Sequence, residues 1–294
     1  MNKKITAAIT GVGAFLPDYI LDNDELSRMV ETSDEWIMTR IGIKTRHIMK
    51  DPTKASSYMG SQAVKELLEK TDTDPKEIDL VICATVTPDM FFPSTGNMIA
   101  YQAGCSNAFA FDVSAACSGF LFALATGSKY IETGACKKVI VVGAEKMSSI
   151  VDYNDRATCP IFGDGAGAAV VTEGDEMKAI RLTTSSLAEV LYYQRALEPT
   201  PYISKEEQFE PLVMKGREVF KHAVTSSCRD IRKLLNQTGL DAADIKVFET
   251  MRKNNPRRYA VAGLGGWGIV DGLVYERWRE EAFDPQSDEF RKAH

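Results

Sequence analysis

Three short apolar runs place the strongest constraint on how this chain can fold. They cover residues 80–86, 138–144 and 166–171, and are rich in valine, isoleucine and alanine. Continuous runs of this kind are typical of strands that are buried on both faces of a sheet. Segments with helical periodicity, such as residues 56–68, alternate with the strand-like ones. The alternation predicts an α/β fold with crossover connections between strands.

The pattern also predicts two halves, 1–173 and 174–294, because a second series of elements begins near Gly174. In the first half we expect a strand over residues 5–12 and a capped helix start at 22–26. The second half is expected to hold a helix over 218–235, strands over 245–248, 259–263 and 274–278, and a frayed charged tail.

Composition excludes several classes of function. The chain has 294 residues, of which 44% are hydrophobic and 26% charged, and a net charge of −6. These values are typical of a soluble globular protein and do not favour binding to nucleic acid or to a membrane surface. We find no secretory signal and no apolar stretch long enough to span a bilayer. The six cysteines contain no CxxC pair, so we expect a reduced, cytoplasmic protein without a zinc site or disulfide framework.

Cys117 is the clearest candidate for a catalytic residue. It follows an apolar run, residues 109–113, and precedes Ser118-Gly119 and a segment of helical apolar density. This pattern predicts a strand, a tight turn and a buried helix, with the thiol at the turn. The positive end of a helix favours a thiolate, which is a good nucleophile for acyl transfer. The alternative is an inert buried cysteine, because free cysteines are among the most buried residues.

The glycine-rich run at residues 163–167 invites comparison with a phosphate-binding loop. No Lys-Ser or Lys-Thr pair follows it, as a P-loop requires. We therefore predict a tight structural turn between packed strands rather than a nucleotide site.

Four stretches carry a resemblance to a known family. They are Glu31–Ile43, Thr87–Ser94, Ala115–Phe120 and Asp155–Ala168. Together they resemble β-ketoacyl-acyl-carrier-protein synthase III, the condensing enzyme that starts bacterial type II fatty-acid synthesis. The resemblance extends from the start of the chain to about Val171.

This resemblance implies a thiolase-like fold, in which two related α/β halves pack in layers in the order αβαβα, usually as a homodimer. It also implies a two-stage reaction. Cys117 would take an acyl group from acyl-CoA, and malonyl acyl carrier protein would then lose CO2 and attack the thioester. In the family a histidine and an asparagine from the second half support the second stage by hydrogen-bonding the thioester carbonyl. Neither a metal nor another cofactor is implied.

The family's motif positions assign further roles, each tied to a binding function. For CoA, they place Trp36 and Arg156 at the adenine, Arg40 at the phosphates and Thr32 at the rim of the site. For the acyl pocket, they place Phe92, which would reach across the dimer, and Phe162. Gly265 would lie in the glycine-rich turn near the oxyanion. An indole face and a guanidinium are suited to stacking on a base. Without the resemblance, Trp36 reads as an ordinary aromatic residue and the two arginines as solvated charges.

The second half departs from the family pattern. The family has His-Gln-Ala-Asn directly after the strand that matches residues 245–248, whereas this chain has Glu249–Arg252. None of the three histidines, His47, His222 and His294, stands at the catalytic position. A block of about two or three elements before the final glycine-rich hairpin is missing, so we expect a truncated second half. A diverged paralogue, a damaged gene and a partner chain that completes the site all remain open.

These observations favour an acyltransferase of the synthase III kind with impaired condensation. Each lost oxyanion donor typically costs on the order of 100- to 1000-fold in rate. One alternative is a non-catalytic protein that binds CoA or acyl carrier protein, or that partners an active subunit. Another is a polyketide starter enzyme on the same fold.

Overall fold

The computed structural model describes residues 6–185, 187–194, 201 and 212–240. The chain divides into two compact units, one of Met1–Asp34 with Ile43–Lys215 and the other of Glu35–Gly42 with Gly216–His294. The predicted boundary at residue 173 stays a prediction, because the strands expected after residue 240 lie outside the described residues.

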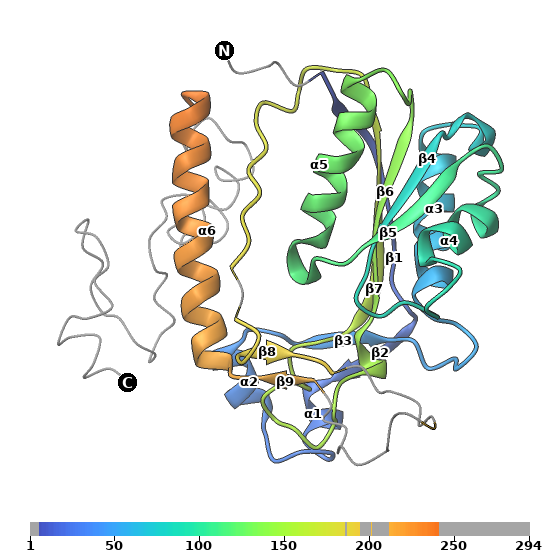
Figure 1. Ribbon diagram of the computed structural model, residues 1–294. Coiled ribbons are helices and arrows are strands. Elements are labelled where there is room, and N and C mark those ends of the chain that lie inside the picture. Colours follow the sequence, from blue (N-terminus) through green and yellow to red (C-terminus); the bar gives the residue numbers. More distant parts are fainter. Residues whose placement is uncertain (1–5, 186, 195–200, 202–211, 241–294) are drawn as a thin grey trace. The chain divides into compact units, whose positions relative to one another are not determined.

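The first unit is built on a five-stranded sheet (Figure 1). Its strands, in spatial order, are β1 (Ala8–Phe15), β7 (Asp164–Thr172), β6 (Val139–Lys146), β4 (Leu80–Ala84) and β5 (Phe109–Val113). Strand β4 pairs in parallel with both β5 and β6, whereas β7 pairs antiparallel with β6 and β1. The α/β prediction is confirmed, and the antiparallel edge makes the sheet mixed.

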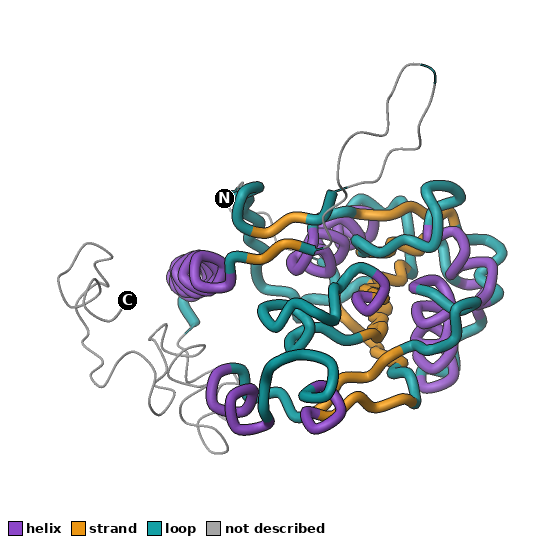
Figure 2. The backbone as a smooth tube through the Cα atoms, turned by 90° about the horizontal axis from the view of Figure 1, so that it is seen from below, coloured by secondary structure: helices purple, strands orange, loops and turns teal. Residues whose placement is uncertain are grey.

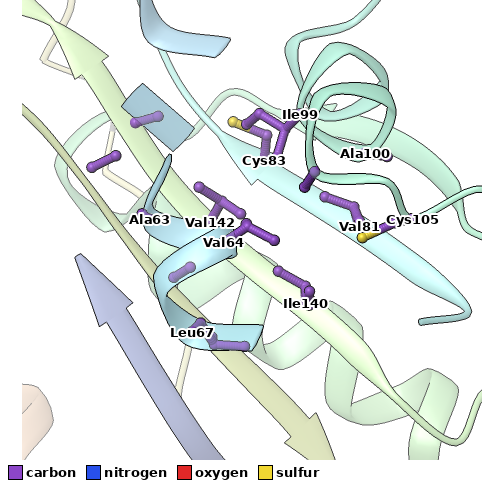
Figure 3. Packing of buried hydrophobic residues seen from close by; sticks show 14 of the residues in the cluster. Ala63, Val64, Leu67, Val81, Cys83, Ile99, Ala100, Cys105, Ile140 and Val142 are labelled. Carbon is purple, nitrogen blue, oxygen red and sulfur yellow. The ribbon is translucent and has the colours of Figure 1, made fainter. Parts of the chain in front are cut away.

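Helices cover both faces of this sheet, α3 (Ser56–Lys70) and α4 (Thr95–Ala103) on one side and α5 (Gly119–Glu132) on the other (Figures 1 and 2). Every residue of β4 is buried. Val81 and Cys83 pack with α3 and α4 in one apolar cluster, shown in Figure 3, and Leu80 and Ile82 pack with α5 in the other. Alternate side chains of a strand point to opposite faces, so a continuous apolar run is what a doubly covered strand requires.

Smaller elements complete the first unit. Strands β2 (Tyr19–Asp22) and β3 (Thr45–Ile48) form an antiparallel pair, as do the short strands β8 (Leu191–Tyr192) and β9 (Val213–Met214). The expected helix start is confirmed in α1 (Asn23–Leu26), where the Asp22 carboxylate accepts a hydrogen bond from Glu25 N at 2.7 Å. The single-turn 3-10 helices are Pro75–Glu77, Ala116–Ser118 and Met147–Ser149.

The described part of the second unit contains α2 (Asp34–Arg40), which begins at the boundary of the first unit, and α6 (Gly216–Thr238). The predicted helix over residues 218–235 is thus confirmed. The strands and the charged tail predicted after residue 240 lie outside the described residues. Within the described part, no helix is long and apolar enough to cross a membrane.

Two predictions are corrected. The run Gly163–Gly167 is not a tight turn, because all of it except Gly163 lies in β7. Gly167 pairs with Gly143 of β6 and with Ala14 of β1, so extended pairing on both sides overrides the turn preference of glycine. The first strand also runs on to Phe15, beyond the predicted end at residue 12, since it keeps its pairing with β7.

Candidate active site around Cys117

Cys117 lies in the turn that joins β5 to α5. The 3-10 turn Ala116–Ser118 follows the strand, and α5 begins at Gly119. Ala116 has φ +46°, a left-handed conformation that costs an L residue about 1–2 kcal/mol. The predicted order of strand, turn and helix is present, with the thiol immediately before the helix.

The start of α5 is pressed against the carboxyl end of β4. A Cβ at Gly119 would lie 3.0 Å from the Ala84 Cβ, so only glycine fits here without a small shift of its neighbour. Cys117, two residues before Gly119, is exposed. The alternative of an inert buried cysteine does not hold for this residue.

The other five cysteines are buried and all six are free. Burial raises the pKa of Cys105 to about 11 and that of Cys159 also to about 11, and it raises the pKa of Cys83 well above its ordinary value. These thiols are neutral at pH 7 and shielded from solvent. Cys117 is therefore the thiol that can react with a large substrate.

A buried hydrogen-bond network fixes the backbone of two of the motif stretches. Arg46 is 3% exposed and donates from Nε and a terminal nitrogen to the Pro160 carbonyl at 2.8 and 2.5 Å. Its other nitrogen donates to Asn23 Oδ1 at 2.5 Å. Asn23 Nδ2 in turn donates to Asp34 Oδ1 at 2.7 Å and to the Ile43 carbonyl at 3.0 Å. Burial lowers the pKa of Arg46.

Sequence reasoning missed Arg46 and Asn23. A lone arginine in a polar strand reads as a solvated charge, and its partners lie 23 and 114 positions away. The only feature of the sequence that could have pointed to Arg46 is its position, three residues after the motif stretch that ends at Ile43.

The residues predicted to bind CoA fall in both units. In the second, the Arg40 guanidinium lies over the half-buried Trp36 ring, 5.0 Å from its centre. Arg156 is exposed in a turn of the first unit, so its pairing with Trp36 stays a prediction. Thr32 Oγ1 is buried, and no described residue forms a hydrogen bond with it.

The predicted acyl-pocket residues both lie in the first unit. The Phe92 side chain is 83% exposed in the loop before α4, and Phe162 is half-buried just before β7. Gly265 lies outside the described residues, as does Glu249–Arg252, where the family histidine would stand.

The described histidines are engaged elsewhere. His47 Nδ1 lies 2.5 Å from the Pro17 carbonyl, and His222 Nε2 lies 3.5 Å from Ser226 Oγ within α6. No group of three or more His, Cys, Asp or Glu side chains within the described ranges is arranged to hold a metal ion.

Comparisons with known proteins agree on one family. The profile of 3-Oxoacyl-[acyl-carrier-protein (ACP)] synthase III matches residues 111–188. Beta-ketoacyl-[acyl-carrier-protein] synthase III 2 of Bacteroides thetaiotaomicron is 47% identical over 244 residues, which cover 81% of this chain and 73% of that protein. The corresponding synthase III of Chlorobium phaeovibrioides is 44% identical over 82% of this chain and 76% of its own length.

Solved structures give the same result. The 3-oxoacyl-[acyl-carrier-protein] synthase III of Aquifex aeolicus superposes with a TM-score of 0.72 at 42% identity, covering 81% of this chain and 74% of that one. The priming β-ketosynthase of the R1128 polyketide pathway superposes with a TM-score of 0.73 at 32% identity, covering 83% and 74%.

Proposed function

The chain belongs to the β-ketoacyl-acyl-carrier-protein synthase III family, and from this premise we propose that it transfers an acyl group from acyl-CoA to Cys117. The family consists of condensing acyltransferases of fatty-acid synthesis, and the fold is α/β and thiolase-like. The observation that carries the proposal is one exposed thiol at the start of α5, among five buried ones.

In the first step the Cys117 sulfur attacks the thioester carbonyl carbon of acyl-CoA. A new carbon–sulfur bond forms to Cys117, the bond to CoA breaks, and CoA leaves as a thiolate that takes up a proton. Cys117 stands in the turn immediately before α5 and is exposed, so its sulfur is accessible to the thioester. In the second step malonyl acyl carrier protein loses CO2, its carbanion attacks the acyl carbon, and the Cys117 thiolate is released.

Trp36, Arg40, Arg156 and Thr32 are the residues that we assign to CoA. The network of Arg46 and Asn23 supports this assignment, because it holds the stretch that precedes Trp36 and the one that follows Arg156. We assign Phe92 and Phe162 to the acyl pocket and Gly265 to the turn near the oxyanion.

Condensation is proposed to be slow in this chain. The motif that supplies the family histidine and asparagine is replaced by Glu249–Arg252, and each missing donor costs on the order of 100- to 1000-fold in rate. Acylation of Cys117 does not use that motif, so the two steps should separate experimentally.

The test is intact mass spectrometry of the purified chain after incubation with acetyl-CoA and with longer acyl-CoAs. We expect an added acyl mass that is absent in Cys117→Ala. A folded protein that gains no acyl mass from any donor would contradict the proposal and leave a binding role for CoA or acyl carrier protein.

A role in priming polyketide synthesis is the second candidate, favoured by the similarity to the priming β-ketosynthase. The panel of acyl-CoAs separates the two roles. Preference for acetyl-CoA favours a fatty-acid starter, and preference for longer or branched starters favours the polyketide role.

We also propose a homodimer. Strand β5 is an edge of the sheet, and Phe109 on it is 50% exposed. Tyr101 on α4 is 85% exposed and Phe92 is 83% exposed. Large apolar side chains at a sheet edge are typical of a surface that pairs with another chain.

A further inference from the structure

The loop between β4 and α4 combines an apolar tip with anchored ends. Met90, Phe91 and Phe92 form the tip, and their side chains are 46%, 71% and 83% exposed. Exposed aromatic side chains on a loop usually mark a contact with a ligand or partner. How firmly such a tip is held decides how well it can select among substrates, because a loosely held wall adapts to any acyl chain.

Glu145, at the end of β6, anchors the start of the loop. Its carboxylate accepts hydrogen bonds from Val86 N at 2.8 Å, Thr87 N at 3.1 Å and Thr85 Oγ1 at 3.3 Å, and also from Thr87 Oγ1. Thr87 Oγ1 in addition accepts from Lys146 N at 2.9 Å. Three successive residues of the loop therefore depend on one side chain of a neighbouring strand.

Two more carboxylates anchor the loop, one on each side of the tip. Asp89 accepts from Ser57 N at 2.7 Å and from Ser57 Oγ at 2.6 Å, which ties the loop to α3. Asp112 of β5 accepts from Thr95 N at 2.8 Å and Gly96 N at 2.7 Å, which fixes the first turn of α4. The tip at residues 90–92 therefore lies in a loop that is hydrogen-bonded to three elements, β6, α3 and β5.

The anchor at Glu145 is energetically expensive. Burial raises the pKa of its carboxyl group, against the hydrogen bonds from the loop, which lower it. A buried carboxylate is costly unless donors surround it. Its hydrogen bonds to the loop offset that cost, so the loop and the carboxylate stabilise each other.

We propose that Glu145 is a positioning residue that sets the acyl-chain preference of the enzyme by fixing the loop that carries Phe92. This inference rests on the proposed function, in which Phe92 walls the acyl pocket of the partner subunit. Glu145 acts through the loop and does not touch the reacting atoms. A change at Glu145 should therefore alter which acyl-CoA is used more than whether Cys117 can be acylated.

Glu145→Gln is the first test, because glutamine keeps the shape but turns an NH2 group toward backbone N–H donors. The rate of Cys117 acylation is measured by intact mass with acetyl-CoA and with longer acyl-CoAs. We expect the ratio of longer-chain to acetyl rates to change on the order of 10-fold, with a smaller change in the acetyl rate.

The control is Asp79→Asn at the opposite end of the same two strands. Asp79 accepts hydrogen bonds from Lys137 N at 2.6 Å and Lys138 N at 3.0 Å, so it joins the start of β4 to the start of β6. Its loss should lower stability and leave the acyl-chain ratio unchanged. An equal drop with every acyl-CoA in Glu145→Gln would show a merely structural role and overturn the inference.

A second pair of variants covers the case in which Glu145→Gln does not fold. Thr87→Val removes the hydroxyl that donates to Glu145, and Thr87→Ser keeps it. We expect the ratio of longer-chain to acetyl rates to shift in the valine variant and to keep its unmodified value in the serine variant. If the unmodified chain is not acylated at all, the proposed function fails; if it is acylated but neither variant moves the ratio, only this inference fails.

Discussion

At the scale of single residues, the six cysteines are all free thiols and differ in their exposure to solvent. Cys117 follows a residue with positive φ and precedes a helix, and it alone among them is exposed. Cys83 and Cys105, by contrast, lie in the apolar cluster beneath α3 and α4. Their raised pKa values follow from the loss of solvation of the thiolate.

This difference predicts selective alkylation. Iodoacetamide at pH 8 should add one carbamidomethyl group to the native protein, because the thiolate is the reactive form and the buried thiols are neutral and shielded. Intact mass counts the groups, and peptide mapping should place the single one at Cys117. Cys117→Ser should gain none when native, while the unmodified chain should gain six when denatured. Labelling of Cys105 or Cys159 at a comparable rate would contradict the burial of these thiols.

The nucleophile turn could be predicted from sequence because its signal is local. An apolar run, a cysteine, Ser-Gly and a helical segment stand within a few residues of each other. Arg46 could not be predicted, because its partners, the Pro160 carbonyl and the Asn23 amide, meet it only in the folded chain. The proposed anchoring role of Glu145 depends likewise on a loop about 60 positions away.

At the scale of elements, close packing between β1 and α3 depends on a glycine. A Cβ at Gly13 would lie 2.3 Å from the Ala63 carbonyl oxygen and 2.6 Å from Leu67 N, both helix backbone atoms. Neither atom can move aside cheaply. At Gly167, which lies in the neighbouring strand β7, a Cβ would meet nothing within 4 Å.

These two glycines give a matched pair of variants. Gly13→Ala should lower the free energy of unfolding by about 1–3 kcal/mol, since the helix must shift from the strand. Gly167→Ala should leave it unchanged or raise it slightly, because alanine loses less backbone entropy than glycine. Urea denaturation followed by circular dichroism measures both. Equal effects of the two changes would contradict the packing of α3 on β1.

The wrong prediction of a tight turn at residues 163–167 is also explained at the scale of elements. Glycine favours turns through its own backbone freedom, and that local preference supported a turn. The strand forms because β6 and β1 both offer partners to β7, and Asp164 accepts hydrogen bonds from Met49 N and Ser148 N. None of these partners can be recognised from the glycine run itself.

At the scale of the whole molecule, the proposed homodimer can be tested at the sheet edge. Sedimentation equilibrium should give a mass of about twice the 32.5 kDa of one chain. Phe109→Asp on β5 should shift the equilibrium toward monomer, because a charge at an apolar contact must be desolvated.

The control for this change is Val12→Asp on β1, the opposite edge of the sheet, where the valine is 62% exposed. It should keep the mass of the unmodified protein. A monomer in the unmodified chain, or dissociation by both changes alike, would contradict a dimer that forms along β5.

The pairing of β1 with β7 also bears on how the protein is made. Strand β1 ends at Phe15, whereas its partner β7 begins at Asp164, about 150 residues later. At a synthesis rate of about 5–20 residues per second, the ribosome needs roughly 7–30 s to produce that partner. Throughout this interval the apolar residues of β1 have no strand to pair with and are available to chaperones. The first strand to be synthesised is therefore among the last to join the sheet.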